Sequence, residues 1–474
     1  MKSYDKSSVQ SIFEYSQGIL GKTLFECVGK KSLYTRKGKG QLGQLVEECF
    51  FGYKANSRRG ADFEKAQLEL KCSPLKKDSR GCLRVKERLV CTLLDFSEVL
   101  EVPFESSHFF LKCRLMLLLF YLHIDGKSAF DLEFLYSVLW RLPEKDLLII
   151  RHDYEIIREK IREGRAHEIS EGDTEYLGAC RKGAGGKKEK KVRQPNSEVP
   201  AFRRAFALKT AYVRTILEFA QKSKRDAVSN FSLAPVAEAV SIEELKEKSF
   251  EEVILERFSR YIGKSAKEIA EAKGILYNPR NKSRYAQSAS AIITTRVAHV
   301  NKSEEFRKSG IELKTIRITC KGRPKEALPF ENINYCDVWE RKKEGWTASR
   351  WYEICTGRFL FTVFRETEKT ESSYGKNVPV YVLDKVFFWT MPPKDLDLAR
   401  DFWENILENI ENCTTSSVCN GYWKDSDGKN FHVRPKGRDS SDKTSTPFEE
   451  ETSKMCYWFN RSYIKTIVDM ASNV

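Results

Sequence analysis

The sequence has no hydrophobic segment long enough to cross a membrane. Its longest apolar run, Leu115–Leu122, is far shorter than the roughly 20 residues that a transmembrane helix needs. The first ten residues, MKSYDKSSVQ, also lack the apolar core of a secretory signal peptide. We therefore expect neither a membrane protein nor a secreted one.

Histidine is scarce, and the cysteines are not paired as metal ligands usually are. The chain contains six histidines and 13 cysteines, an odd number, and no two cysteines are spaced as CxxC. Disulfide frameworks normally use an even number of cysteines, and structural zinc sites use closely spaced Cys and His. The sequence thus predicts reduced thiols, a cytoplasmic location and no zinc site.

Positive charge, by contrast, is in excess. Lysine and arginine number 82 against 67 acidic residues, which gives a formal net charge of +15. Hydrophobic residues make up 41% of the chain and charged residues 31%, proportions typical of a folded globular protein. A net charge of this size and sign favours a polyanionic partner, either nucleic acid or an acidic membrane face.

The chain is an internal duplication. Four segments of its first half recur in the same order in its second half, which is very unlikely by chance. We divide it into copy one (residues 1–222), a polar linker (223–243) and copy two (244–474). The matching pairs are residues 17–26 (QGILGKTLFE) with 259–268 (SRYIGKSAKE), 62–71 (DFEKAQLELK) with 305–314 (EFRKSGIELK), 145–161 with 394–410, and 212–217 (YVRTIL) with 463–468 (YIKTIV).

Within a copy, the residue patterns predict a helix, then strands, then further helices. Helical spacing covers residues 13–28, 151–165 and 205–222. Residues 68–72 alternate as a strand does, and residues 111–122 are apolar enough for a buried strand. This mixture indicates an α/β class of domain.

The candidate catalytic residues are concentrated in residues 60–71, GADFEKAQLELK. In an extended strand, Glu69 and Lys71 project from one face while Leu70 projects from the other. Asp62 precedes them by a turn and can converge on the same place. Two carboxylates beside a lysine form an oxygen-rich site suited to Mg²⁺, which can polarise a phosphodiester. The alternative is an edge strand whose charges are only solvated.

Upstream, residues 39–47 (KGQLGQLVE) place Glu47 on a helical face as a third acid. These segments resemble the MutH family of nicking endonucleases and their restriction-enzyme relatives, in which a KGxxGxxLE helix is followed by DF…ELK. Two tandem MutH-like halves resemble the Sau-three-A-I type of GATC-cutting type II restriction endonuclease. The resemblance implies an α/β fold with two restriction-endonuclease-like domains, each a mixed sheet flanked by helices with a DNA-binding cleft.

The resemblance also implies a role for each candidate residue in copy one. Asp62 and Glu69 would hold Mg²⁺, with Glu47 as a further ligand or its support. Lys71 would orient the attacking water, and Lys112, which follows Ser107-His108, would contact phosphate or help position the site. Three basic residues of copy one would contact DNA: Lys39 in KGQLG, Arg181 in EYLGACRK and Lys209 in RAFALKTAY.

Copy two has lost several of these residues. Glu312 and Lys314 keep the ELK strand, but Glu305 replaces the aspartate and Ile354 replaces the second lysine. No acid occurs between residues 272 and 303, so the third carboxylate is also missing. We expect copy two to be catalytically silent and to bind DNA through late basic and aromatic residues, although Tyr457 has core packing as an equal alternative: Arg434, Lys436, Tyr457 and Arg461.

The sequence therefore predicts a Mg²⁺-dependent type II restriction endonuclease that cuts double-stranded DNA, with GATC as the implied target. Copy one would be catalytic, and copy two would be an allosteric module that binds a second DNA site. A cognate DNA methyltransferase would belong to the same system without direct contact. Two alternatives are a MutH-type strand-nicking repair endonuclease and a non-enzymatic sequence-specific DNA-binding protein.

Overall fold

The computed structural model describes residues 3–29, 41–54, 60–78, 81–182, 191–225, 237–296, 299–373, 376–412, 421–448 and 451–471. The chain forms two compact units. Unit 1 comprises Met1–Val236 with Arg307–Ser309, and unit 2 comprises Ala237–Phe306 and Gly310–Val474. The division after residue 236 falls inside the predicted linker. None of the helices in these ranges is both long and apolar enough to span a bilayer.

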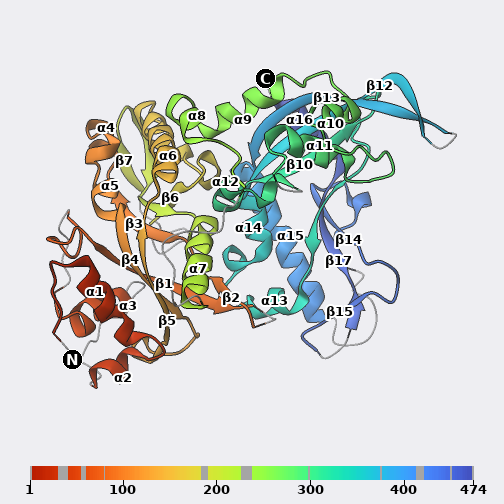
Figure 1. Cartoon of the computed structure of the whole chain (residues 1–474). Helices are drawn as coiled ribbons and strands as arrows, with labels where there is room; N and C mark the ends of the chain where they lie inside the picture. The colour runs from red at the N-terminus through yellow and green to blue at the C-terminus, as the bar shows by residue number, and fades with distance from the viewer. Residues whose placement is uncertain are drawn as a thin grey trace. The chain divides into compact units, whose positions relative to one another are not determined.

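Unit 1 alternates short helices and strands in an α/β arrangement (Figure 1). Its helices are α1 (Val9–Ser16), α2 (Leu24–Val28), α3 (Gln41–Leu45), α4 (Phe96–Glu101), α5 (His108–Cys113), α6 (Glu144–Arg162) and α7 (Thr210–Arg225). Its strands are β1 (Glu69–Lys77), β2 (Leu83–Val85), β3 (Leu89–Leu94), β4 (Leu115–Leu122), β5 (Phe134–Arg141), β6 (Leu177–Arg181), β7 (Lys191–Gln194), β8 (Ser197–Phe202) and β9 (Arg204–Leu208).

The main sheet of unit 1 is mixed, with strand order β2-β1-β4-β5. Strands β1 and β4 run parallel, in a register that pairs Glu69 with Met116 and Lys71 with Leu118. The other two pairs in this sheet are antiparallel. A second sheet has the order β3-β9-β6. The mixed sheet confirms the predicted fold class, while the DNA-binding cleft stays a prediction.

One face of the main sheet packs against the N-terminal helices α1 to α3. The buried side chains include Ile12 of α1, Leu45 of α3, and Leu68 and Leu70 around the start of β1. Burial of such aliphatic side chains contributes about 1.5–3 kcal/mol each relative to exposure, which fixes the sheet face that must turn inward. Glu69 and the charged groups that contact it therefore lie on the opposite face of β1.

Three predicted elements have different limits in the structure. Residues 13–28 are not one helix, because the chain breaks at Gly21, with φ of 71°, and restarts at the Thr23 cap of α2. Residues 111–122 divide between α5 and β4, and residues 205–222 divide between β9 and α7. In both of the latter cases a continuous apolar run conceals a change from one element to another.

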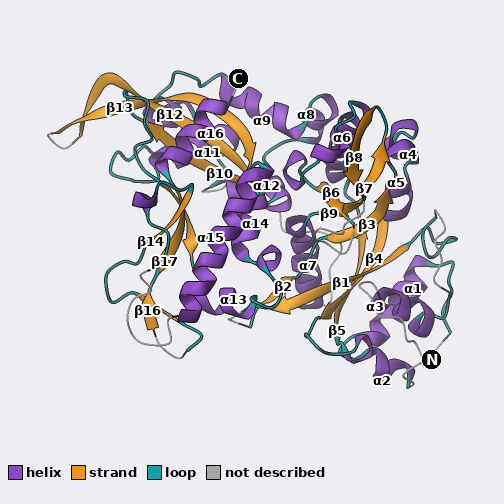
Figure 2. Cartoon of the chain, turned by 180° about the vertical axis from the view of Figure 1, so that it is seen from behind, coloured by secondary structure: helices purple, strands orange, loops and turns teal. Residues whose placement is uncertain are grey.

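Unit 2 repeats this arrangement with longer strands (Figure 2). Its helices are α8 (Ile242–Glu247), α9 (Phe250–Ser259), α10 (Ala266–Ala272), α11 (Arg284–Ile293), α13 (Tyr335–Glu340), α14 (Arg350–Thr356), α15 (Pro393–Asn412) and α16 (Arg461–Met470). Helix α12 (Glu304–Ser309) is divided, because its residues Arg307–Ser309 belong to unit 1. Its strands are β10 (Glu312–Ile318), β11 (Leu328–Asn332), β12 (Arg358–Ser373), β13 (Lys376–Thr390), β14 (Phe431–Pro435), β15 (Lys443–Ser445), β16 (Glu451–Ser453) and β17 (Met455–Phe459).

The strand orders of the two units correspond. The order β10-β12-β13 in unit 2, with a parallel pair followed by an antiparallel pair, matches β1-β4-β5 in unit 1. The order β11-β17-β14 likewise matches β3-β9-β6. Strands β12 and β13 also continue as a long two-stranded ribbon beyond the sheet (Figure 1). The internal duplication seen in the sequence is therefore a duplication of topology.

Candidate active site and DNA-contact residues

A tight turn folds Asp62 back onto the start of β1. Phe63 and Leu68 pair across this turn through two backbone hydrogen bonds of 3.0 and 3.3 Å. The Asp62 carboxylate consequently accepts a hydrogen bond of 2.9 Å from the Leu70 N–H. The Asp62 N–H donates in turn to Oε2 of Glu69 at 3.2 Å. The two predicted metal-binding acids are thus held beside each other.

Two lysines meet on the Glu69 carboxylate. Nζ of Lys71 lies 2.6 Å from Oε1 of Glu69, and Nζ of Lys112 lies 3.1 Å from the same oxygen. Lys112 is carried by α5, whose N-terminus is capped by Ser107, which accepts the Phe110 N–H at 3.1 Å. Because Glu69 is only 1% exposed, its charge requires such partners. The prediction that Glu69 and Lys71 share one strand face is confirmed.

Glu47 lies in a π-helical turn, η2 (Val46–Phe50), that continues α3. The turn is closed by the Phe51 N–H, which donates to the Val46 carbonyl at 3.0 Å. Single π turns are rare and occur frequently at functional sites. Within this turn Val46 and Phe50 enter the core, and Glu47 remains half-buried next to the other acids.

The three acids repel one another. Burial raises the pKa of Glu47 to about 7, and the negative charges of Asp62 and Glu69 add to the rise. Burial, followed by the charge of Glu69, likewise raises the pKa of Asp62 to about 6. Burial alone would lower the pKa of Lys71, but the adjacent Glu69 outweighs it and the pKa is raised. The cluster therefore has more negative charge than its two lysines neutralise.

The donor set fits a hard divalent cation in chemistry. The acids offer only oxygen atoms, and their mutual repulsion is what a bound cation would relieve. As placed, however, the described side chains contain no group of three or more His, Cys, Asp or Glu that could hold a metal ion. Lys71 and Lys112 engage Glu69 instead. The metal assignment to Asp62, Glu69 and Glu47 therefore stays a prediction.

The three DNA-contact candidates of copy one have different environments. Lys39 lies outside the described residues. Arg181, at the end of β6, is exposed, and its guanidinium lies 4.2 Å from the centroid of the Phe202 ring. Lys209 donates from Nζ to the Thr174 carbonyl, which ties it to the protein. Of the two residues that the structure describes, Arg181 is the more exposed.

Asp153 is an important residue that the sequence patterns did not reveal. It is fully buried on α6 and accepts three backbone N–H groups, those of Glu175, Tyr176 and Leu177, at 2.6, 2.7 and 2.8 Å. Burial, with the nearby Glu175 carboxylate, raises its pKa well above the ordinary value. Asp153 thereby fixes the segment that enters β6 and carries Arg181.

Two residues of copy two that correspond to the acids of copy one hold backbone groups instead. Ser290 lies three residues before the end of α11, as Glu47 does before the end of η2, and it accepts the Val300 N–H at 2.6 Å. Glu305 accepts the Ala239 N–H at 2.7 Å. Both side chains have become structural. The position in copy two that corresponds to Glu47 is thus occupied by Ser290 and not by an acid.

The second lysine of copy two is replaced by a core residue. Ser349 caps α14 as Ser107 caps α5, so Ile354 occupies the position of Lys112. Ile354 is 6% exposed and belongs to the hydrophobic core of the unit. Lys314 and Glu312 persist as an ion pair of 2.9 Å.

The basic residues late in copy two surround Trp458. The Arg434 guanidinium and the Lys436 ammonium lie 5.2 and 5.7 Å from the centroid of the Trp458 ring. The His432 ring stacks on it at 5.9 Å between centroids. We call Arg434, Lys436, His432 and Trp458 the Trp458 patch. Arg461 is exposed and lies outside this patch.

Tyr457 points away from the Trp458 patch. It is 2% exposed and stacks on Trp351, with 4.8 Å between ring centroids. Successive side chains of a strand alternate between its faces, so Tyr457 and Trp458 cannot both line the same surface. The structure thus favours the core-packing alternative for Tyr457, and Trp458 replaces it as the aromatic candidate.

Comparison with known proteins agrees with this geometry. The family described as DNA mismatch repair enzyme MutH matches residues 51–153, a range that holds Asp62, Glu69, Lys71 and Lys112. The type II restriction enzyme Sau3AI of Staphylococcus aureus is 30% identical over 504 residues, covering 97% of this chain and 98% of that protein. The chain belongs to the Sau3AI family of type II restriction endonucleases.

A member of the Sau3AI family built from two MutH-like copies should match MutH itself over one half. The DNA mismatch repair protein MutH of Shewanella woodyi is 24% identical over 222 residues, which is 45% of this chain and 93% of that protein. The relation to the Sau3AI family makes the chain a site-specific deoxyribonuclease. Enzymes of this kind generally use a divalent metal.

Proposed function

We propose that this protein cleaves double-stranded DNA at a short specific site, with Mg²⁺ as its metal and GATC as its target. The observation that carries the proposal is the convergence of Asp62 and Glu69 with Lys71 and Lys112 at the edge of the β1–β4 pair. Copy one is the catalytic copy in this proposal. A cognate DNA methyltransferase would act on the same site in the same cytoplasm.

The lysines of copy one supply positive charge and N–H donors to the scissile phosphate. An ammonium group has three N–H donors. Lys71 and Lys112 each direct one of them to Glu69, which leaves donors for water and for phosphate oxygens. Lys71 orients the attacking water, and Lys112 offsets the negative charge that develops on the phosphorane.

Asp62 and Glu69 would hold the metal, with Glu47 as a further ligand or support. When bound, Mg²⁺ would polarise the phosphodiester and lower the pKa of the attacking water. The task of the chain itself is to keep the acids adjacent, through the Asp62–Glu69 and Leu70–Asp62 hydrogen bonds. In-line attack would leave a 5′-phosphate and a 3′-hydroxyl.

The proposal is tested by incubating a supercoiled plasmid with the protein and Mg²⁺, then sequencing the ends. Linear products with ends at GATC are the expected result. Nicked circles alone would indicate the strand-nicking repair activity instead. Binding without any cleavage would indicate a non-enzymatic DNA-binding protein and would overturn the proposal.

We propose that copy two binds DNA through the Trp458 patch. Arg434 is exposed at the end of β14, and the patch combines positive charge with an aromatic ring, as DNA-contacting surfaces do. The indole N–H and the His432 ring of the patch are buried, so Arg434 and Lys436 are its exposed groups. Ala207 of β9 in copy one corresponds to Trp458, because each is one residue before the last residue of its strand in the pairings β6–β9 and β14–β17.

Copy two is expected to make no cuts of its own. The double variant Glu312→Ala and Lys314→Ala should retain turnover within about threefold of the wild type. The reason is that the remaining acids needed for metal binding are absent there or engaged structurally, as Ser290 and Glu305 show. The measurement is the initial rate of plasmid linearisation. A rate loss as large as that of Asp62→Ala, with unfolding temperature unchanged, would assign copy two its own active site.

A second DNA site is expected to stimulate cleavage. Coupling between two binding sites typically contributes about 1–3 kcal/mol, or roughly 5–150-fold. A plasmid with two targets should therefore be cut at least about fivefold faster than a matched plasmid with one. A short target duplex added in trans should rescue the one-site plasmid.

The Trp458 patch provides the control for this stimulation. Arg434→Gln and Trp458→Ala should each remove the rescue in trans while leaving the one-site rate unchanged. Arg323→Gln, at an exposed arginine of unit 2 outside the patch, should preserve the rescue. If the one-site and two-site plasmids are cleaved at equal rates, and the added duplex does not raise the one-site rate, copy two has only a structural role.

A further inference from the structure

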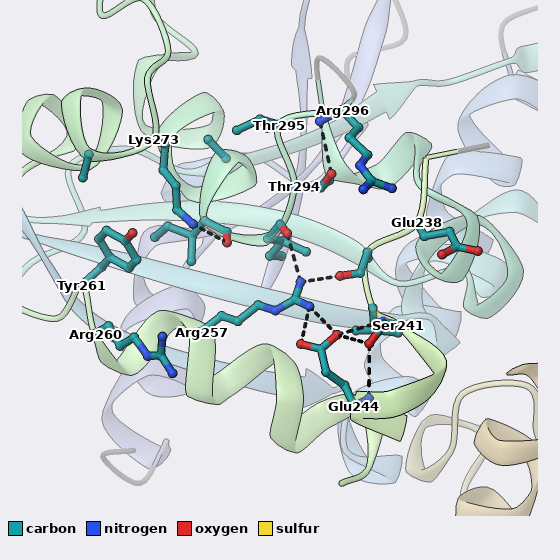
Figure 3. Close-up of a pocket in the computed structure, with 16 residues that line it drawn as sticks. Glu238, Ser241, Glu244, Arg257, Arg260, Tyr261, Lys273, Thr294, Thr295 and Arg296 are labelled. Carbon is teal, nitrogen blue, oxygen red and sulfur yellow. Dashed lines mark hydrogen bonds and ion pairs between the residues drawn. The ribbon is translucent and has the colours of Figure 1, made fainter. Parts of the chain in front are cut away.

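Unit 2 contains a cavity that lies outside the ELK strand and the Trp458 patch. It has a volume of about 650 Å³, within the range of small-molecule sites. Its walls come from the C-terminal ends of α9, α10 and α11 and from residues 238–241 (Figure 3). The charged groups that line it are Arg257, Arg260, Lys273 and Arg296, with Glu238 and Glu244.

The equivalent place in copy one is filled by aromatic rings. Tyr15 and Arg257 correspond when the matched segments 17–26 and 259–268 are extended by two residues, and Phe50 corresponds to Ile293 as the last residue of its helix. Tyr15 packs on Phe50 at 4.8 Å and on Tyr4 at 4.2 Å between centroids. In copy two an arginine and an isoleucine stand at the positions of these two aromatic residues, and both line the cavity.

Arg257 has kept the backbone contact of the tyrosine that it replaces. The Tyr15 hydroxyl donates to the Phe50 carbonyl at 3.0 Å, and the Arg257 guanidinium donates to the Ile293 carbonyl at 3.0 Å. Arg257 also forms an ion pair with Glu244 at 2.6 Å. Its charge is therefore already neutralised, and it supports the cavity wall rather than a ligand.

Two other arginines of the cavity have free guanidinium groups. Within the part of the chain that the structure describes, neither Arg260 nor Arg296 forms a side-chain hydrogen bond or ion pair, and both are exposed. Arg260, Tyr261 and Lys273 lie toward one side of the cavity, and Arg296 lies toward the other, with Glu238 (Figure 3). The first side thus carries two cations, Arg260 and Lys273; Glu256, one turn before Arg260, is itself paired with Lys248 at 2.7 Å.

Lys273 strengthens the basic side and offsets part of the negative end of α11. Its Nζ donates to the Ile292 carbonyl at 3.2 Å, near the C-terminal end of α11. Helix C-termini repel anions, and this ammonium covers one of the exposed carbonyls. Two further N–H donors of Lys273 remain, and its Nζ lies 5.2 Å from the centroid of the Tyr261 ring.

We propose that this cavity binds the phosphate group of a nucleotide-sized phosphate ester, with Arg260 and Lys273 as the phosphate ligands. The planar fork of an arginine matches two phosphate oxygens, and the Lys273 ammonium on the same side of the cavity adds a second positive charge (Figure 3). Copy one has Gly18 at the position of Arg260, so this cation is specific to copy two. The site thus belongs to the copy that has lost catalysis.

The wall of the cavity is tied to the relic of the active site. Glu305 accepts the Ala239 N–H at 2.7 Å, and Ala239 lines the cavity. The Ala239 carbonyl also accepts a hydrogen bond from Arg257. The acid that corresponds to the catalytic Asp62 therefore now shapes a wall of the proposed site.

The test is isothermal titration calorimetry of the full-length protein with dAMP and with inorganic pyrophosphate, in EDTA so that metal plays no part. Binding of either probe at micromolar to millimolar concentration is the expected result. Arg260→Gln should weaken it at least about tenfold, as loss of a charge-assisted hydrogen bond does. Arg323→Gln should leave it unchanged.

A cavity-filling variant keeps the test independent of charge. Ile293→Phe restores the residue of copy one and should abolish binding while the unfolding temperature stays within a few degrees. Competition with a target duplex distinguishes the two sources of phosphate. Displacement of dAMP by duplex assigns the site to a DNA backbone phosphate, and simultaneous binding assigns it to a free nucleotide. No binding by the wild type, or equal binding by all variants, overturns the proposal.

This inference does not rest on the proposed function. The readout is heat of binding in the absence of metal, so failure of DNA cleavage would leave it unaffected. Failure of dAMP and pyrophosphate to bind would likewise leave the cleavage assay unchanged.

Discussion

Asp62→Ala is expected to lower the rate of DNA cleavage by more than about a hundredfold while DNA binding is retained. Loss of a residue that only supports a metal ligand typically costs 10–100-fold, so loss of a ligand should cost more. Removal of a carboxylate also reduces repulsion of the phosphate backbone, so affinity should be equal or tighter. The measurements are single-turnover cleavage in Mg²⁺ and fluorescence anisotropy of a labelled target duplex.

Asp62→Asn separates loss of charge from loss of structure. The amide keeps an oxygen for the Leu70 N–H, which the carboxylate accepts at 2.9 Å, but it is a poor metal ligand. It should be as inactive as the alanine variant and more stable. Near wild-type cleavage by either variant would remove Asp62 from the site. Glu69→Ala should follow Asp62→Ala in activity.

Asp153→Ala is expected to lower the free energy of unfolding by at least about 3 kcal/mol. The variant leaves three buried backbone N–H groups without an acceptor, and each such group costs about 1–3 kcal/mol. The measurement is urea denaturation followed by tryptophan fluorescence. Because two units can unfold separately, the transition of copy one must be resolved before the comparison is made.

The matched control lies on the same helix. Glu159→Ala removes a half-exposed acid of α6 that pairs with Arg162, and exposed pairs of this kind contribute about 0–1 kcal/mol. A loss from Asp153→Ala no larger than that of the control would mean that the segment entering β6 is held by other contacts. It would also weaken the case for Arg181 as a positioned DNA contact.

Local alternation and charge type were sufficient to predict the strand that carries Glu69 and Lys71. Glu69 and Lys71 are two residues apart, so any extended conformation places them on one face, and the structure gives that arrangement. The approach of Asp62 depends on a feature that sequence patterns do not show. Gln67 adopts a positive φ of 51°, which is uncommon for a residue with a side chain and reverses the chain within a few residues.

Other features depend on context that no local pattern carries. The boundary between α5 and β4 falls inside a run of apolar residues, where periodicity cannot distinguish a helix from a buried strand. The Ser107 cap marks where α5 begins but gives no signal of where it ends. The choice between Tyr457 and Trp458 needed the pairing of β17 with β14, because either residue could have faced the core. Asp153 acts on a segment more than 20 residues away in sequence.

The contact between Glu305 and Ala239 has a consequence for the history of the second copy. Restoring an aspartate at position 305 would shorten the side chain and release a buried backbone N–H that it now satisfies. Regaining catalysis would also require an acid in place of Ser290 and a lysine in place of the buried Ile354. If copy two makes no cuts, as we propose, no single substitution would give it the side chains of copy one, and the three changes would have to occur together.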